Sequence, residues 1–405
     1  MRYASIATGV LATAVLAVPL AAPAMADSSP RSTVTVAQGD HVRGDGSHAF
    51  RGGHDGKKNN SVQLQKALDD IVKAGAPGVV AEVRDADGVW RGHSGKADLK
   101  KNKPTRNDGL FRIGSVTKTF VSTVVLQLVQ EGKVKLDDSV ERHLPGVVPN
   151  GENVTVRQLL NHRSGLHSYT DTLWKGDLHR FHDTRFKAYT PHELIADSNA
   201  HPPTFAPGTD GHYSNTNYVL LGMLIEKVTG NTAQAEIKER VIEPLGLERT
   251  TFPDKSTRIN GPHANGYMRL DGPASSFTDV TEYSTSWAWT AGAMISDTTD
   301  LNTFYKALVT GKLLRADLMK EMKETKALDD GSQYGLGIAK FENAAFGTAY
   351  GHVGGTPGFA THAFTLADGS RQVTVSINAM ADTDEENRAA GMAVKTLLTL
   401  GSKAK

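Results

Sequence analysis

The chain has 405 residues, of which 39% are hydrophobic and 22% charged, and its formal net charge is +1. This ordinary balance fits one or two globular domains and does not indicate a nucleic acid or an anionic membrane surface as a partner. The sequence contains no cysteine, so disulfide bonds cannot contribute to its stability.

The first 26 residues have the features of a secretory signal peptide. Arg2 gives a positively charged start, an apolar stretch follows, and Ala24-Met25-Ala26 forms a small-x-small cleavage site before Asp27. No later stretch is apolar enough to span a bilayer, so we expect no membrane anchor. The sequence therefore predicts a secreted, extracellular protein from which residues 1–26 are removed.

Residues 27–60 contain many Gly, His, Ser and charged residues and few apolar ones. Such a composition cannot bury enough apolar surface to order itself, so we predict a disordered leader. The segment includes Arg43-Gly44-Asp45 and a set of spaced histidines, His41, His48 and His54. Short motifs occur often by chance, and we interpret these as parts of a solvated tail, not as an adhesion motif or a metal site.

The pattern from residue 61 onward predicts an α+β fold. Apolar residues at helical spacing fill 61–75, and two strands are expected within 77–99. Helical patterns dominate about 113–311, strands return in about 333–379, and a last helix covers about 384–400. We expect one antiparallel sheet completed by both ends of the chain, with flanking terminal helices and the mostly helical region inserted between its halves.

Ser115 and Lys118 stand three residues apart at the start of a long apolar helical pattern. Positions i and i+3 share one face of a helix, and the unpaired amides at a helix start favour negative charge. A lysine buried there has a lowered pKa and can take a proton from the serine. A solvated lysine beside a helix-capping serine is the alternative.

Two later motifs carry further candidate residues. Tyr213 and Asn215 precede another apolar helix, and His352 precedes Gly354 at the end of a predicted strand. A phenol near an ammonium can titrate below its usual pKa and relay protons, and an amide can hold both the lysine and a substrate carbonyl. Taken alone, each of these residues is better explained by packing, helix capping or an ordinary place in a sheet.

The order Ser-x-x-Lys, Tyr-x-Asn and His-x-Gly resembles that of the penicillin-recognising serine enzymes. These include the class C β-lactamases and the Streptomyces-type D-alanyl-D-alanine carboxypeptidases. The stretches "RIGSVTKTF", "YSNTNYVLLGMLIEKVTG" and "SWAWTAGAMISDTTDL" are similar as well. The resemblance covers about 61–400 and implies a β-lactamase/transpeptidase-like catalytic domain.

The resemblance also implies roles for individual residues. Ser115 is the expected nucleophile, Lys118 and Tyr213 exchange the proton, and Asn215 orients the lysine and the substrate amide. His352 is expected to polarise Tyr213. The main-chain amides of Ser115 and Gly355 are the expected oxyanion hole, with Gly354 beside it and Trp287 walling the cleft.

Three positions depart from the carboxypeptidase pattern. Val353 and Gly355 stand where close relatives have threonines, and Ala339 stands where they have an arginine. Lys340 is adjacent to Ala339, but neighbouring strand residues face opposite sides of a sheet, so we expect it to point away. The contacts to a free substrate carboxylate therefore look weakened.

These features predict a secreted serine hydrolase that forms an acyl-enzyme, foremost a D-alanyl-D-alanine carboxypeptidase acting on peptidoglycan-type peptides. A class C-like β-lactamase, a D-aminopeptidase and an esterase remain open, and so does a non-catalytic penicillin- or wall-fragment-binding protein. No ordered set of metal ligands is present in the sequence, so we expect neither metal nor cofactor. The expected partner is a small peptide or β-lactam substrate, and the expected state is a monomer.

Overall fold

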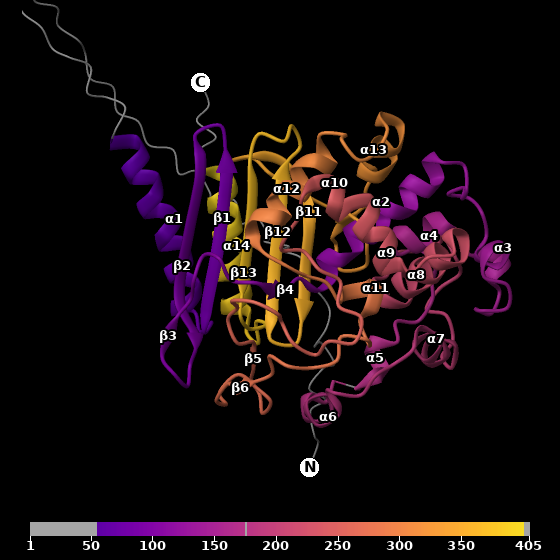
Figure 1. Cartoon of the computed structure of the whole chain (residues 1–405), viewed down its shortest axis with the longest axis horizontal. Coiled ribbons are helices and arrows are strands. Elements are labelled where there is room, and N and C mark those ends of the chain that lie inside the picture. Colours follow the sequence, from indigo (N-terminus) through magenta and orange to yellow (C-terminus); the bar gives the residue numbers. More distant parts are fainter. Residues whose placement is uncertain (1–54, 175, 401–405) are drawn as a thin grey trace, which may run out of the picture.

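A computed structural model of the chain describes residues 55–174 and 176–400. Within these residues, nine strands form one antiparallel sheet in the order β3-β2-β1-β13-β12-β11-β10-β9-β8 (Figure 1). The strands are β1 (Gly78–Asp85), β2 (Gly88–Asp98), β3 (Lys103–Pro104), β8 (Lys326–Ala327), β9 (Gln333–Tyr334), β10 (Ala339–Asn343), β11 (Gly347–Thr356), β12 (Phe359–Leu366) and β13 (Gln372–Ile377).

The two ends of the chain meet in the middle of this sheet. Strand β1 pairs with β13, so that Val79 lies opposite Ile377 and Val83 opposite Val373. The alternating apolar residues of both strands face the same core, and this common face sets their register. The predicted α+β fold is confirmed, including the sheet assembled from both ends of the chain.

Helices α1 (Asp55–Lys73) and α14 (Asp384–Thr399) cover one face of the sheet (Figure 1). Thr383 and Glu386 form a capping box that begins α14. Helix α1 begins six residues before the predicted start of the fold at 61, so the predicted leader is too long at its end. The predicted signal peptide, the rest of the leader and its histidines lie outside the described residues.

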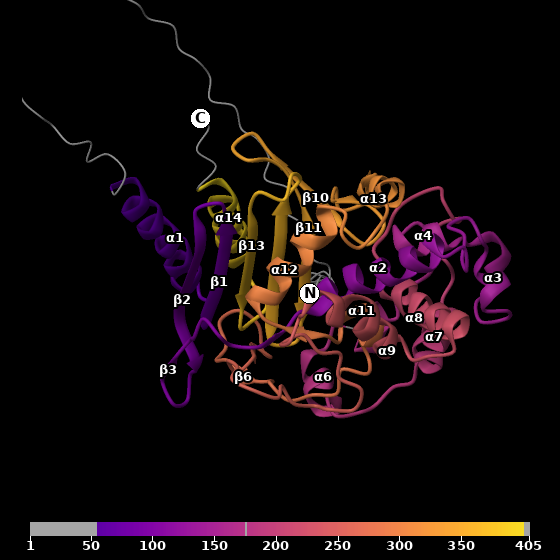
Figure 2. The ribbon, with the colours of Figure 1, turned by 45° about the horizontal axis from the view of Figure 1, so that its top comes forward.

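The helical region lies against the opposite face and the far edge of the sheet (Figure 2). Helix α2 (Thr117–Gln130) is buried on nearly every side, and its buried residues are mainly apolar with a few hydroxyls and Lys118 among them. It packs against α8 (Asn215–Thr229), which ends at Gly230 in the left-handed conformation. Together they place the starts of both helices, and hence the predicted motifs, beside β11.

Shorter elements complete the helical region. The other helices are α3 (Val140–His143), α4 (Val156–Leu160), α5 (Thr170–Leu173), α6 (Leu178–Thr184), α7 (Pro191–Asn199), α9 (Ala233–Ile237), α10 (Glu243–Leu245), α11 (Trp289–Gly292), α12 (Thr298–Val309), α13 (Ala316–Lys323), η1 (Gly114–Val116), η2 (Gly151–Asn153) and η3 (Lys238–Ile242). The short strands β4 (Phe111–Arg112) and β7 (Ile295–Ser296) pair with each other, as do β5 (Tyr267–Met268) and β6 (Thr278–Asp279).

Candidate active site

Ser115 lies in the short 3₁₀ turn η1, directly before α2, and is only 8% exposed. Gly114 precedes it at φ +51°, a conformation that L side chains rarely adopt. A Cβ added at Gly114 would lie 2.7 Å from the carbonyl oxygen of Gly355, and one added at Gly354 would overlap the carbonyl oxygen of Ile113. Glycines on both sides therefore allow η1 and β11 to approach backbone to backbone.

This approach places the predicted amide donors close together. A Cβ on Gly354 would lie 3.2 Å from the amide nitrogen of Ser115, so the edge of β11 borders the nucleophile's own amide. The first amides of a helix have no partner within the helix. The Ser115 and Gly355 amides are therefore neighbours in a position suited to an oxyanion.

The amine of Lys118 contacts three oxygen atoms. Its Nζ lies 3.1 Å from the hydroxyl oxygen of Ser115, 2.7 Å from Oδ1 of Asn215 and 2.7 Å from the carbonyl oxygen of Ala291. Complete burial lowers the pKa of Lys118 well below its ordinary value of 10.5. A neutral amine has two N–H bonds, and Asn215 and Ala291 can only accept them. The lone pair of Nζ is then left facing the Ser115 hydroxyl, which suits a base.

Asn215 is fixed by residues that sequence reasoning missed. It is the first residue of α8, its amide nitrogen Nδ2 donates to Thr170 Oγ1 at 3.0 Å, and its backbone N–H donates to Ser168 Oγ at 3.1 Å. These bonds settle which end of the side-chain amide faces Lys118. The stretch "LHSYT" contains both hydroxyls, but nothing in its spacing indicates that they meet Asn215.

Tyr213 lies beside Lys118, whose Nζ is 4.9 Å from the centre of its ring. Burial raises the pKa of Tyr213 well above its ordinary value, and the nearby Ser115 hydroxyl opposes this only in part. The expectation of a lowered pKa is wrong, because burial of the phenol itself outweighs every other influence on it. No described group hydrogen-bonds the phenol with good geometry, so a protonated Tyr213 hydroxyl is free to donate to a substrate.

His162 is a buried residue that the sequence analysis did not single out. Its ring lies 4.1 Å from that of Tyr213, and its Nδ1 accepts the backbone N–H of Ser214 at 3.2 Å. Its φ of +58° is unusual for a residue with a side chain, and burial lowers its pKa well below 6.5. A neutral His162 therefore orients the Tyr213 ring and the segment that leads to Asn215.

His352 is close to this cluster but does not have the predicted contact. Its Nδ1 lies by the carbonyl of Val353, which can only accept, so its Nε2 accepts the hydroxyl of Tyr334 at 2.8 Å. Its ring centre is 6.5 Å from that of Tyr213. Burial lowers the pKa of His352 to about 3. The structure thus contradicts the expectation that His352 polarises Tyr213 directly, and a neutral ring supplies no positive charge.

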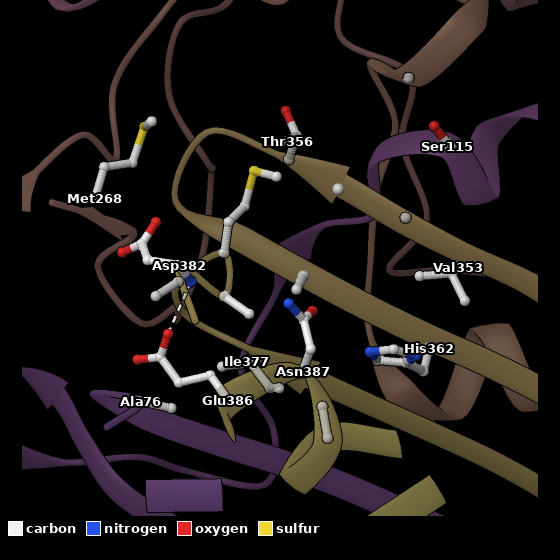
Figure 3. Close-up of a pocket in the computed structure, with 18 of the residues that line it drawn as sticks. Ala76, Ser115, Met268, Val353, Thr356, His362, Ile377, Asp382, Glu386 and Asn387 are labelled. Atoms are coloured by element: carbon white, nitrogen blue, oxygen red, sulfur yellow. Dashed lines mark hydrogen bonds between the residues drawn. The ribbon is translucent and has the colours of Figure 1, made fainter. Parts of the chain in front are cut away.

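A cavity of about 480 Å³ opens from Ser115 and runs past the end of β11 to α14 (Figure 3). Trp287 lines it, as predicted for a wall of the cleft, and so does Tyr169, whose hydroxyl donates to the Trp287 carbonyl at 2.6 Å. The predicted residues Ser115, Tyr213, Asn215, Trp287, Gly354 and Gly355 all line this cavity. Lys118 and His352 lie behind its surface.

The charged residues of the cavity lie at its α14 end and are mainly acidic. Arg269 is bonded to Asp382 at 3.0 Å and to Glu386 at 2.9 Å, so its charge is already neutralised. Figure 3 shows Asp382 and Glu386 on the opposite side of the cavity from Ser115. Lys340 does not line the cavity and pairs with Glu342 at 2.7 Å, as expected for a residue that points away.

No described helix is both long and apolar enough to cross a membrane. Among the described histidines and carboxylates, no group of three is placed to hold a metal ion.

Comparison with known proteins identifies relatives along most of the chain. Residues 64–396 match the family model described as Beta-lactamase. A D-stereospecific amidohydrolase from Streptomyces sp. is 39% identical and has a similar structure, with a TM-score of 0.75 over 82% of this chain and 98% of that one.

Two further relatives are more distant. The D-amino acid amidase of Ochrobactrum anthropi SV3, solved with D-phenylalanine, is 27% identical, with a TM-score of 0.75 over 84% of this chain and 99% of that one. A penicillin-binding protein of Bacillus subtilis (strain 168) is 25% identical over 350 residues, which are 82% of this chain and 74% of that protein.

Proposed function

This chain belongs to the beta-lactamase family and is a serine hydrolase, and we propose that it is a secreted enzyme that hydrolyses amides or short peptides of D-amino acids. The observation that carries this proposal is the character of the cavity around Ser115. Among the described residues that line the cavity, Arg269 is the one basic residue with a permanent charge. The carboxylates of Asp382 and Glu386 already bind it. A free substrate carboxylate would therefore be buried without a partner, which is costly.

The proposed reaction begins at Ser115. Its hydroxyl proton passes to the lone pair of Lys118 Nζ while Oγ bonds to the substrate carbonyl carbon. The carbonyl oxygen becomes an anion and accepts hydrogen bonds from the amides of Ser115 and Gly355. When the intermediate collapses, the leaving amine takes a proton from Tyr213, which Lys118 then reprotonates. Water attacks the acyl-enzyme by the same route and releases the D-amino acid.

Likeness to named enzymes supports the substrate class. The 39% identical relative is described as a D-stereospecific amidohydrolase, and a second is described as a D-amino acid amidase. An esterase activity would use the same acyl-enzyme, because the alcohol of an ester is an easier leaving group than an amine.

The carboxypeptidase expected from the motif order is the second candidate. A relative named as a penicillin-binding protein and the His-x-Gly motif at His352 favour it. The missing carboxylate contacts at Val353, Gly355 and Ala339 weigh against it.

One panel of substrates separates the candidates. The purified protein is incubated with D-alanine amide, L-alanine amide, D-alanine methyl ester and an acyl-D-Ala-D-Ala peptide, and products are measured. We expect hydrolysis of the D-amide and D-ester, little of the L-amide and much slower cleavage of the acyl dipeptide. A strong preference for the acyl dipeptide would establish the carboxypeptidase and overturn the proposal.

A further inference from the structure

His362, on β12, is a buried polar residue that the proposed reaction does not use. It is 9% exposed, lines the same cavity as Ser115, and has no hydrogen-bond partner among the described residues. Its sheet neighbours are Val353 on β11 and Val375 on β13. Burial lowers its pKa to about 4, so near pH 7 the ring has one unused N–H donor and one unused acceptor. Neither ring nitrogen is among the buried unpaired atoms, so both reach the open space of the cavity, where a ligand can bond them.

The side chains around His362 form what we call the inner compartment, the part of the cavity between the sheet and α14. Besides His362 it is lined by apolar residues and one amide, Val353, Ala360, Ile377, Asn387 and Ala390, and Glu386 lies at its border. The Asn387 amide nitrogen donates to the Thr383 carbonyl at 3.1 Å, and no described residue donates to its oxygen. Figure 3 shows His362, Ile377 and Asn387 together on the α14 side of the strands.

The inner compartment is open to the nucleophile. The cavity is continuous from Ser115 past Gly355, where the absence of a side chain keeps the passage clear. A Cβ added at Gly355 would lie 3.3 Å from Cε of Met380, so even a methyl group would narrow it. A group attached to the acyl carbon at Ser115 can thus extend into the compartment.

We propose that the inner compartment is the subsite for the side chain of the D-aminoacyl group, and that it takes an aromatic ring with a hydrogen-bonding tip, the side chain of D-tyrosine. This inference rests on the proposed D-amino acid amide hydrolysis. The apolar lining suits a ring, and His362 and Asn387 offer a phenol both an acceptor and a donor. A carboxylate tip is disfavoured, because Asp382 and Glu386 line the same end of the cavity.

The first experiment compares substrates that differ only in the acyl side chain. The specificity constant kcat/KM is measured for the amides of D-tyrosine, D-phenylalanine and D-alanine. We expect D-tyrosine amide to be preferred over D-phenylalanine amide by about three- to tenfold, the worth of one hydrogen bond to a buried neutral partner. In His362→Leu this ratio should fall to about one. The matched control His192→Leu, at an exposed site on α7, should keep the wild-type ratio.

A second variant tests the space instead of the hydrogen bond. Ala390→Phe on α14 fills the compartment, so kcat/KM should fall at least tenfold more for the two aromatic amides than for D-alanine amide, whose methyl group does not reach it. Equal losses for all three amides, or a ratio of one already in the wild type, would overturn the subsite and leave a compartment filled by water. Melting temperatures within a few degrees of the wild type show that each variant is folded.

Failure of the subsite and failure of the proposed function give different results. If the wild type hydrolyses none of the three D-amides, the proposed function is wrong. If it hydrolyses D-amides but neither variant changes the aromatic preference, only the subsite is wrong. If Ala390→Phe slows D-alanine benzylamide at least tenfold more than D-alanine amide, the leaving group lies in the compartment, and the assignment to the acyl side chain is overturned.

Discussion

The amine of Lys118 lies 3.1 Å from the hydroxyl oxygen of Ser115, and its two other oxygen contacts are obligatory acceptors. A neutral amine in this position has only its lone pair to offer the serine. The proposed catalysis therefore requires a neutral Lys118, and a permanently positive side chain in its place would not serve.

Replacing Lys118 by arginine should abolish acylation while keeping a positive group. A guanidinium cannot give up its proton near neutral pH, so Ser115 would lose its base. We expect a loss of about 100- to 10,000-fold in the rate of adduct formation with penicillin, measured by intact mass. Lys227→Arg, at an exposed site on α8, is the control. Near-normal acylation in Lys118→Arg would mean that the lysine serves only the fold.

His162→Leu should lower activity more than His162→Asn. Leucine removes the acceptor for the Ser214 N–H and tolerates the left-handed backbone poorly, whereas asparagine keeps an acceptor and adopts that conformation more readily. We expect kcat to fall about ten- to 100-fold in the leucine variant with little change in KM, because the Tyr213 ring loses its orientation. Equal kcat values for the two variants would argue against a positioning role.

Gly354→Ala should disrupt the contact between β11 and η1. The new methyl group would overlap the carbonyl oxygen of Ile113, so either the nucleophile or the strand must shift. A displacement of about 1 Å can cost 100-fold in rate, and we expect at least that loss in kcat/KM. Gly109→Ala is the matched control, since its Cβ would have no neighbour nearer than 3.5 Å. Normal activity in Gly354→Ala would exclude a role for this close approach.

Stability should decrease as the pH falls below neutrality. Burial lowers the pKa of His352 to about 3 and that of His362 to about 4, from an ordinary value of 6.5. At pH values between these lowered pKa values and 6.5, the two histidines bind protons in the unfolded chain but not in the folded one. The free energy of unfolding is therefore greatest above about pH 7 and falls toward pH 3.

Urea unfolding at pH 7.5 and pH 5 measures this effect, which should amount to on the order of a few kcal/mol for the histidines together. Other groups also titrate in this range, so the informative comparison is with His352→Gln. That variant should show a shallower decrease of stability between the two pH values. An unchanged slope would mean that His352 is not neutral in the folded protein.

The double variant Val353→Thr with Ala339→Arg should create a site for a free substrate carboxylate. Ala339 pairs with Gly351, two residues from Val353, so both positions lie on the same face of the sheet. A charged hydrogen bond to a carboxylate is worth about 1.5–3 kcal/mol, so kcat/KM for an acyl-D-Ala-D-Ala peptide should rise about ten- to 100-fold. The rate on a matched amide without the carboxylate is the reference. No gain would indicate that another group binds that end of the substrate.

The sequence by itself determined the parts of this protein that depend on local pattern. Alternating apolar residues at both ends predicted the antiparallel sheet, because period-two patterning is a property of each strand alone. The order of three short motifs predicted that Ser115, Lys118, Tyr213 and Asn215 would meet, and the structure brings them together. The one misplaced boundary of the folded region, at Asp55, lies in a polar stretch whose helical structure no apolar periodicity marks.

Only the tertiary structure decided which groups are charged and what each one contacts. The pKa of Tyr213 is raised and not lowered because the phenol is completely buried, and burial is a property of the whole fold. His352 bonds Tyr334 because β9 brings that hydroxyl to it, and His162 reaches Tyr213 from 51 positions earlier in the chain. The inner compartment likewise arises where β12 and α14 pack, between residues whose sequence spacing carries no sign of their proximity.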